Sequence, residues 1–194
     1  MIDIIVLHGG TSRRMGCDKA QLRVAGKRLI DHVLEHVAAL PELPGRVILV
    51  GPALPIPTAD YPFEIAFTQE SPPFGGPAAG IAAGFSLRRT TCSTIAVISV
   101  DAPESPAVLP ELLTQATNSA AVATLDDHLQ PLLSCWPVTV LAQALVQLGE
   151  PHNKPAKALL RDIDPVVVPV DSRGRDYDTL AEIAKFGPVD NPPS

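Results

Sequence analysis

Short runs of apolar residues alternate along the chain with longer segments in which apolar positions recur every three or four residues. This alternation predicts βαβ units around a mostly parallel sheet. The short runs are rich in Val and Ile and contain few polar positions, which is typical of strands covered on both faces. The clearest strands are predicted at residues 3–7, 46–50, 94–100 and 165–170, with weaker candidates at 63–67, 120–125 and 130–136.

Helices are predicted between these strands. From residue 27 to residue 40, five apolar side chains share one helical face, and Pro41 ends the segment. A second helix begins after Gly76-Pro77, where proline suits the first turn, and a third follows Ser105-Pro106. Further helices are predicted at 138–148, 155–160 and 179–185. The pattern therefore predicts one α/β domain over residues 1–186, followed by a frayed tail at 187–194.

The composition is that of a folded chain. Hydrophobic residues make up 46% of the 194 residues and charged residues 19%, which is far from the composition of disordered proteins. No stretch reaches the roughly 18 consecutive apolar residues of a membrane span, and no basic leader precedes the first strand. We therefore expect a soluble, cytoplasmic protein. Its three cysteines are far apart, which supports neither a disulfide framework nor a zinc knuckle.

The net charge of -6 argues against nucleic acid or an anionic membrane as a partner, because such partners select for a basic surface. The charge is unevenly distributed, however. Between Arg13 and Arg28 there are six basic residues and one acid, which is a net charge of +5. This stretch, called the basic segment below, predicts a small anionic ligand.

The basic segment begins in a glycine-bearing loop that directly follows the first predicted strand. The loop reads His8-Gly9-Gly10-Thr11-Ser12-Arg13-Arg14-Met15-Gly16-Cys17-Asp18-Lys19. Glycines let consecutive amides approach phosphate oxygens, Arg14 and Lys19 supply positive charge, and doubly wound sheets bind ligands at the carboxyl ends of their strands. The loop matches neither a Walker A sequence nor a dinucleotide-binding fingerprint. Glycine content and charge alone are equally compatible with a solvated surface loop.

Asp101 ends the most hydrophobic predicted strand. An unpaired buried carboxylate is costly, so we expect this one to be paired or metal-bound. Mg²⁺ suits the position because it takes one or two carboxylates together with phosphate oxygens. The alternative is a helix N-cap. Asp178 allows the same two interpretations, as a second metal ligand or as a cap for the helix that begins at Thr179.

Another pattern points to zinc. His32-Val33-Leu34-Glu35-His36 matches the His-x-x-Glu-His pattern of one class of zinc proteases. The apolar face of the predicted helix leaves these polar side chains toward solvent, and no convincing third ligand follows downstream. We therefore do not expect zinc hydrolysis. His128 and His152 are expected in loops, and Ser12 lacks the Gly-x-Ser-x-Gly elbow of a hydrolase.

The loop from Gly9 to Gly16, with the following Asp18-Lys19-Ala20, closely resembles the signature loop of the molybdenum cofactor guanylyltransferases, the MobA family of nucleotidyltransferases. Further matches follow in order and cover nearly the whole chain. The second glycine loop of the family is similar to Gly76-Pro77-Ala78-Ala79-Gly80-Ile81, and its metal-site motif is similar to Asp101-Ala102-Pro103. Its later segments resemble Gln130-Pro131-Leu132-Leu133 with Trp136, and Asp176-Tyr177-Asp178-Thr179.

The resemblance implies a three-layer, Rossmann-like nucleotidyltransferase fold with a mostly parallel central sheet. It also implies transfer of GMP from GTP to the phosphate of molybdopterin-bound molybdenum cofactor, with release of pyrophosphate and with Mg²⁺ as cofactor. Molybdoenzymes or their chaperones are candidate partners. The residues implied are Arg14, Lys19 and Asp101 for catalysis; Leu7, His8, Gly9, Gly10, Arg14, Lys19, Glu70, Gly76 and Asp101 for GTP binding; and Asp101, with Asp178 as a candidate second ligand, for the metal.

Three positions depart from the family pattern. His8 replaces the usual alanine, so its ring either crowds the base or points away from it. Val50 replaces an asparagine that is common at the end of the second strand, and Glu70 is the best candidate for the aspartate that precedes the second glycine loop. Two alternative functions therefore stay open. One is cytidylyl or other nucleotidyl transfer to a pterin or another phosphorylated metabolite, and the other is a non-catalytic homologue that binds nucleotide or pterin.

Overall fold

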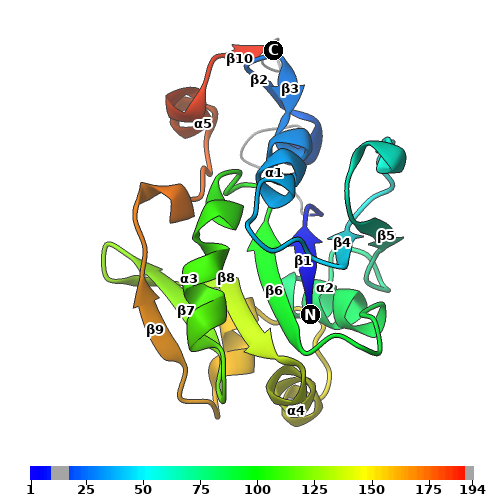
Figure 1. Cartoon of the computed structure of the whole chain (residues 1–194), viewed down its shortest axis with the longest axis vertical. Helices are drawn as coiled ribbons and strands as arrows, with labels where there is room; N and C mark the ends of the chain where they lie inside the picture. Colours follow the sequence, from blue (N-terminus) through cyan, green and yellow to red (C-terminus); the bar gives the residue numbers. More distant parts are fainter. Residues whose placement is uncertain (10–17, 191–194) are drawn as a thin grey trace.

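A seven-stranded sheet forms the centre of the protein (Figure 1). The computed structural model describes residues 1–9 and 18–190, and the strand count refers to this part of the chain. Along the sheet the order is β5 (Glu64–Thr68), β4 (Arg46–Val50), β1 (Ile2–Leu7), β6 (Thr94–Ser99), β8 (His128–Pro137), β7 (Ala121–Leu125) and β9 (Val166–Pro169). The first four strands are mutually parallel, β9 is parallel to β7, and β8 is antiparallel to both of its neighbours. The predicted mostly parallel α/β sheet is confirmed.

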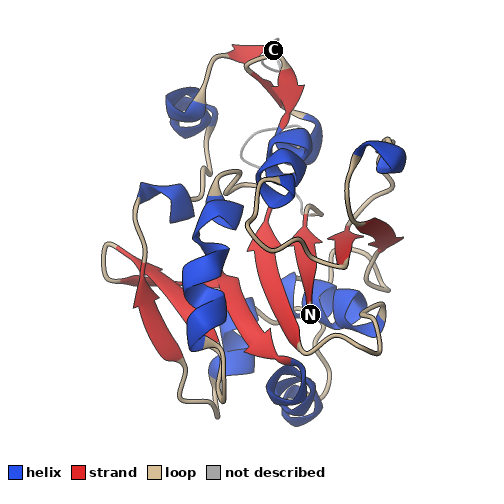
Figure 2. Cartoon of the chain, viewed as in Figure 1, coloured by secondary structure: helices blue, strands red, loops and turns tan. Residues whose placement is uncertain are grey.

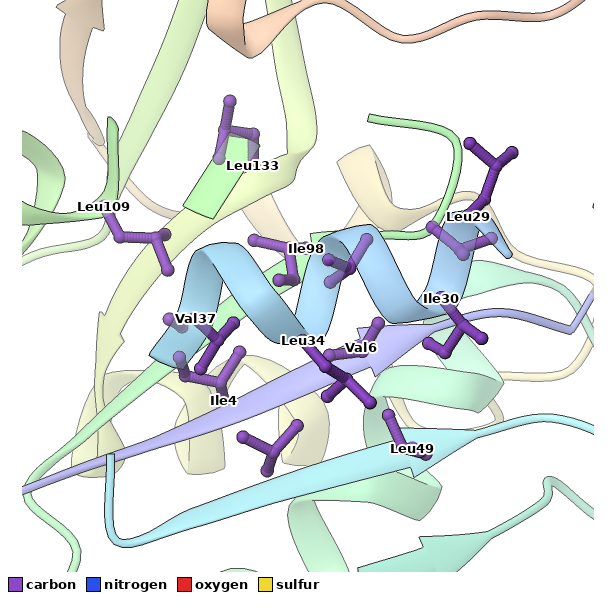
Figure 3. Packing of buried hydrophobic residues seen from close by; sticks show 14 of the residues in the cluster. Ile4, Val6, Leu29, Ile30, Leu34, Val37, Leu49, Ile98, Leu109 and Leu133 are labelled. Atoms are coloured by element: carbon purple, nitrogen blue, oxygen red, sulfur yellow. The ribbon is translucent and has the colours of Figure 1, made fainter. Parts of the chain in front are cut away.

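Helices cover both faces of the sheet and give three layers (Figure 2). On one face lie α1 (Leu29–Ala38) and α3 (Leu109–Gln115), and on the other lie α2 (Pro77–Ser86) and α4 (Val138–Leu148). Successive side chains of a strand point to opposite faces. Ile4 and Val6 of β1 therefore pack with α1, as Figure 3 shows, whereas Ile5 and Leu7 pack with α2. This burial on both faces explains why β1 reads as a continuous apolar run.

The first predicted helix starts too early in the sequence. Residues 27–28 form β3 (Lys27–Arg28), which pairs with β2 (Arg23–Val24) through a turn at Ala25 and Gly26, where φ is 50° and 82°. The strand β10 (Val189–Asp190) adds to the free edge of β2. The prediction of a frayed tail is therefore wrong for residues 187–190, and residues 191–194 lie outside the described part.

Two further predictions need correction. The strand predicted at 165–170 is not covered on both faces, because β9 is the last strand of the sheet and its Val166 and Val167 side chains are 39% and 49% exposed. The helix predicted at 155–160 is the 3-10 helix η4 (Ala156–Leu160), and α3 is preceded by another, η3 (Ser105–Val108). Two more short 3-10 helices matter for the site, η1 (Lys19–Gln21) and η5 (Ser172–Gly174).

The carboxyl ends of β1 and β6 point toward the small sheet of β2, β3 and β10 and toward α5 (Leu180–Phe186) (Figure 1). Residues 23–28 and residues 180–190 therefore lie together beyond this edge of the central sheet. No helix in residues 1–9 and 18–190 is long and apolar enough to cross a bilayer.

Candidate functional site

The carboxyl end of β1 is anchored to the end of β4. The backbone N–H groups of His8 and Gly9 both donate to the carbonyl oxygen of Val50, at 3.0 and 3.1 Å. A Cβ atom on Gly9 would lie only 3.0 Å from the Cα atom of Gly51, so a glycine suits this close approach of two backbones. The loop therefore leaves the sheet from a defined position. The predicted site residues Gly10 and Arg14 lie outside the described residues.

The His8 side chain packs against β4. It is 5% exposed, and a Cβ atom on Gly51 would lie 2.8 Å from its Cε1 and Nδ1 atoms, so the ring rests where Gly51 has no side chain. Its Nδ1 atom is buried and has no partner among the described residues. Burial lowers the pKa of His8, and the negative charges of Asp18 and Glu70 only partly oppose this shift. The ring is therefore held neutral.

Lys19 joins segments from both ends of the chain. Its Nζ atom donates to the carbonyl oxygen of Tyr177 and to Oδ1 of Asp178, both at 3.1 Å, and lies 3.5 Å from Oδ2 of Asp101. The Lys19 side chain is only 13% exposed. Its position is set by η1, whose N-cap residue is Asp18. The structure thus brings together three of the residues predicted from sequence.

Asp101 lies two residues beyond the end of β6, and its side chain is 24% exposed. Its Oδ1 atom accepts a hydrogen bond from the Ser99 hydroxyl, while Oδ2 faces Lys19. The carboxylate is therefore paired within the protein. It caps no helix, because the N-cap residue of η3 is Glu104. Ser99 was missed in the sequence because nothing in the strand pattern distinguishes a serine that orients a carboxylate from an ordinary strand residue.

The segment from Asp176 to Asp178 is fixed to the end of β6. The N–H group of Tyr177 donates to the carbonyl oxygen of Asp101 at 2.9 Å. Burial raises the pKa of Asp176, and the charges of Asp101 and Asp178 raise it further, whereas Lys19 lowers it. Three carboxyl groups therefore lie within electrostatic range of one another, and Lys19 offsets part of their repulsion.

The start of α5 holds the backbone of Asp178 in place. Thr179 is the N-cap residue, and its hydroxyl oxygen accepts a hydrogen bond from the Glu182 N–H at 3.2 Å. In return, Glu182 accepts hydrogen bonds from the N–H groups of Asp178 and Thr179, both at 2.9 Å. This reciprocal arrangement is a capping box. Thr179 rather than Asp178 therefore caps the helix, and the carboxylate of Asp178 is directed to Lys19.

The second glycine loop is braced by residues 153–154, which carry no motif in the sequence. The N–H group of Asn153 donates to the carbonyl oxygen of Gly75 at 2.6 Å. Gly76 has a φ of 84°, and a Cβ atom there would lie 3.3 Å from the carbonyl oxygen of Lys154. Glycine is required at position 76 both for its conformation and for this contact.

Glu70 and His152 both lie beside Gly75. A Cβ atom on Gly75 would be 2.8 Å from Nδ1 of His152 and 3.4 Å from Cγ of Glu70. His152 thus belongs to the surroundings of the second glycine loop, although it is far from this loop in the sequence. No sequence signal identifies it, since only the docking of residues 152–154 brings it here. Val50 lies at the end of β4 and, with 2% exposure, is part of the core.

Much of the positive charge of the basic segment is used locally. Lys27 and Arg28 of β3 pair with acidic residues of α1, Lys27 with Glu35 at 2.7 Å and Arg28 with Asp31 at 2.6 Å. The Arg23 guanidinium donates to the carbonyl oxygen of Gly26. Lys19 is the member of the described residues 18–28 whose cationic group faces the site. The net charge of the segment therefore overstates the charge available to a ligand.

The His-x-x-Glu-His pattern on α1 has a structural explanation. His32 donates from Nε2 to the carbonyl oxygen of Val24, and His36 donates from Nδ1 to the carbonyl oxygen of His32, both at 2.8 Å. Glu35 is paired with Lys27. The His32 side chain therefore links α1 to β2, and the His36 side chain bonds to the preceding turn of α1. No group of three or more His, Cys, Asp and Glu side chains arranged to hold a metal occurs in the part of the chain that the structure describes.

Residues 4–170 match the family described as MobA-like NTP transferase domain. The chain belongs to this family. Among its relatives, the molybdenum cofactor guanylyltransferase of Pseudomonas putida is 31% identical over 163 residues, which cover 82% of each chain. The molybdenum cofactor guanylyltransferase of Rhizobium meliloti is 32% identical over 142 residues, which cover 70% of this chain and 63% of the relative. The match thus spans less than two thirds of the R. meliloti protein.

Solved structures share the fold over nearly the whole chain. Molybdopterin-guanine dinucleotide biosynthesis protein A from Archaeoglobus fulgidus superposes with a TM-score of 0.66 at 22% identity, covering 95% of this chain and 96% of its own. The 4-diphosphocytidyl-2C-methyl-D-erythritol synthase from Anaerococcus prevotii has a TM-score of 0.72 at 14% identity, covering 95% and 93%. At such identities the similarity establishes the Rossmann-like nucleotidyltransferase fold alone.

Proposed function

We propose that this protein transfers GMP from GTP to the phosphate of molybdopterin-bound molybdenum cofactor and releases pyrophosphate. The observation that carries the proposal is the position of Lys19, which lies between Asp101 and Asp178 at the carboxyl ends of the parallel strands. Ligands of open α/β sheets bind at this edge. Membership of the MobA-like family and the names of its relatives support the choice of reaction.

The reaction does not need a strong general base. The attacking group is a phosphate monoester whose second pKa is near 6, so it is largely ionised at neutral pH. The task of the protein is to align nucleophile and leaving group and to offset the repulsion between their charges. We assign Lys19 and Arg14 to the triphosphate. The end of β1, at Leu7, His8 and Gly9, and the second glycine loop, with Glu70 and Gly76, are assigned to the rest of the nucleotide.

The residues at the site fit Mg²⁺. Asp101 and Asp178 direct carboxylate oxygens at the same ammonium group, and Mg²⁺ accepts one or two carboxylates while phosphate oxygens complete its shell. Asp101, with Asp178 as the second ligand, would hold the ion. When bound, Mg²⁺ neutralises charge on the phosphates. Ser99 orients Asp101, and the capping box of α5 orients Asp178.

The nucleotide preference tests this function. Titration of the protein with GTP, CTP, ATP and UTP in the presence of Mg²⁺ should show the tightest binding for GTP, and GTP with molybdopterin cofactor should yield pyrophosphate. Equal affinities, or a preference for CTP, would contradict the guanylyl assignment. GTP binding without pyrophosphate release would support the non-catalytic alternative.

Lys19→Ala supplies a second test. The variant should lose about a hundredfold or more in rate, as is typical when one charged contact to a reacting group is removed. Lys27→Ala is the matched control, because it removes the same charge from the same segment at an ion pair between β3 and α1. Equal rates for the Lys19→Ala protein and the wild type, with both folded, would mean that Lys19 does not contact the phosphates.

A further inference from the structure

The Lys19 ammonium occupies an environment made of oxygen atoms. It carries three N–H donors, and the described part of the chain places three oxygens around it: Tyr177 O and Asp178 Oδ1, both at 3.1 Å, and Asp101 Oδ2 at 3.5 Å. Two of these oxygens are carboxylate oxygens and one is a carbonyl oxygen. A small hard cation prefers the same kind of ligand. The ammonium thus fills the position between the two carboxylates that were assigned to Mg²⁺.

The arrangement is built from several elements. Lys19 starts η1, Asp101 follows β6, and Asp178 precedes α5, so three segments converge on one charge. The Ser99 hydroxyl orients the Asp101 carboxylate, and the N–H group of Asp178 holds the backbone of that residue through Glu182. Neither of these hydrogen bonds involves Lys19, so both remain when the cation between the carboxylates changes. Because both carboxylates are drawn to the same ammonium group, their mutual repulsion requires that some cation be present between them.

We propose that Lys19 is a built-in counter-cation that competes with the divalent metal ion for Asp101 and Asp178, so that the protein without nucleotide binds metal weakly. This inference rests on the proposed function. A bound nucleotide triphosphate gives Lys19 a second set of anionic partners. Lys19 can then turn from the carboxylates to the phosphates without loss of pairing, and the carboxylates become available to the metal ion. Metal and nucleotide therefore bind together rather than separately.

Removing the charge of Lys19 should tighten the binding of the metal ion and weaken the binding of GTP. The test titrates the nucleotide-free protein with MnCl₂, followed by electron paramagnetic resonance of free Mn²⁺. Lys19→Met keeps the length of the side chain and removes its charge. We expect Mn²⁺ to bind this variant at least about tenfold more tightly than the wild type, since a like charge a few ångströms away is removed. GTP affinity should fall in the same variant.

Control variants distinguish the effect of the Lys19 charge on Mn²⁺ binding from the effects of net charge and of unfolding. Lys27→Met removes the same charge from the ion pair with Glu35 of α1 and should leave Mn²⁺ affinity within about twofold of the wild type, because both members of this pair are solvent-exposed and salt screens exposed charges. Lys19→Arg keeps the charge and should keep Mn²⁺ binding weak. Melting curves show whether each protein is folded, and Lys19→Gln replaces Lys19→Met if the latter is not.

Unchanged or weaker Mn²⁺ binding in the folded Lys19→Met protein would overturn the proposal, as would equal tightening in Lys27→Met. The outcome is independent of the transfer assay. Tighter Mn²⁺ binding in Lys19→Met, together with a wild-type protein that transfers no GMP from GTP, would support the counter-cation and refute the proposed reaction. Normal transfer by the wild type, together with unchanged Mn²⁺ binding in Lys19→Met, would support the reaction and overturn the counter-cation.

Discussion

Helix α2 packs on β1, and the two elements approach each other closely at Gly84. A Cβ atom on Gly84 would lie 2.8 Å from Cγ2 of Ile5 and 3.1 Å from both its Cγ1 and Cδ1 atoms. Ile5 is fully buried, and β1 is hydrogen-bonded on both sides, to β4 and to β6. Neither partner can move easily, so Gly84→Ala should destabilise the protein.

The magnitude follows from two opposing effects. Forcing a methyl group into a well-packed contact costs about 1–3 kcal/mol. Replacing glycine by alanine inside a helix recovers about 1 kcal/mol. We therefore expect a net loss of about 1 kcal/mol in the free energy of unfolding, which lowers the melting temperature by about 2–4 °C in a protein of this size.

Gly80→Ala is the matched control on the same face of α2. Its Cβ atom would meet Cδ2 of Leu7 at 3.1 Å, which is the end of a side chain that can rotate. The gain in helix propensity is the same, so the difference between the two variants isolates the contact with Ile5. Urea unfolding of both proteins measures it. A Gly84→Ala protein as stable as Gly80→Ala would refute the packing argument.

Two further predictions concern the ends of β1 and of the chain. The pKa of His8 is lowered in the folded protein, so below pH 6.5 the unfolded chain binds a proton that the native protein does not, and stability should fall on acidification. His8→Ala should flatten this dependence in melting curves between about pH 7.5 and pH 5.5. Thr179→Ala removes the N-cap of α5 and should lower the free energy of unfolding by about 1 kcal/mol in urea titrations.

Each of these predictions has a matched comparison. His128→Ala removes an exposed histidine instead, and equal slopes for the His8→Ala protein and the wild type would contradict the assigned role of burial. Thr179→Ser retains a hydroxyl at the cap position and should keep most of the stability. If Thr179→Ala is as stable as Thr179→Ser, the capping box does not hold this end of the chain.

Elements whose stability comes from their own apolar pattern could be predicted from the sequence. The strand predicted at 46–50 and the helix predicted at 138–148 coincide with β4 and α4. Their side chains repeat with the period of the element, so each element carries its own signal. The apolar pattern of residues 165–170 wrongly predicted a strand covered on both faces, because only the order of strands in the sheet makes β9 an edge strand. The helical pattern also wrongly included residues 27–28, which pair with β2 in a hairpin that β10 extends.

The candidate site also has features that the sequence predicts and features that only the tertiary structure decides. Local motifs in the sequence were enough to single out Lys19, Asp101 and Asp178. Tertiary structure alone decided that these side chains meet, since Lys19 and Asp178 are 159 positions apart in the chain. It also decided which charges of the basic segment remain for a ligand and that His152 lies beside the second glycine loop. A residue type and its neighbours are local properties, whereas the pairing of a charge depends on distances that exist only after the sheet has assembled.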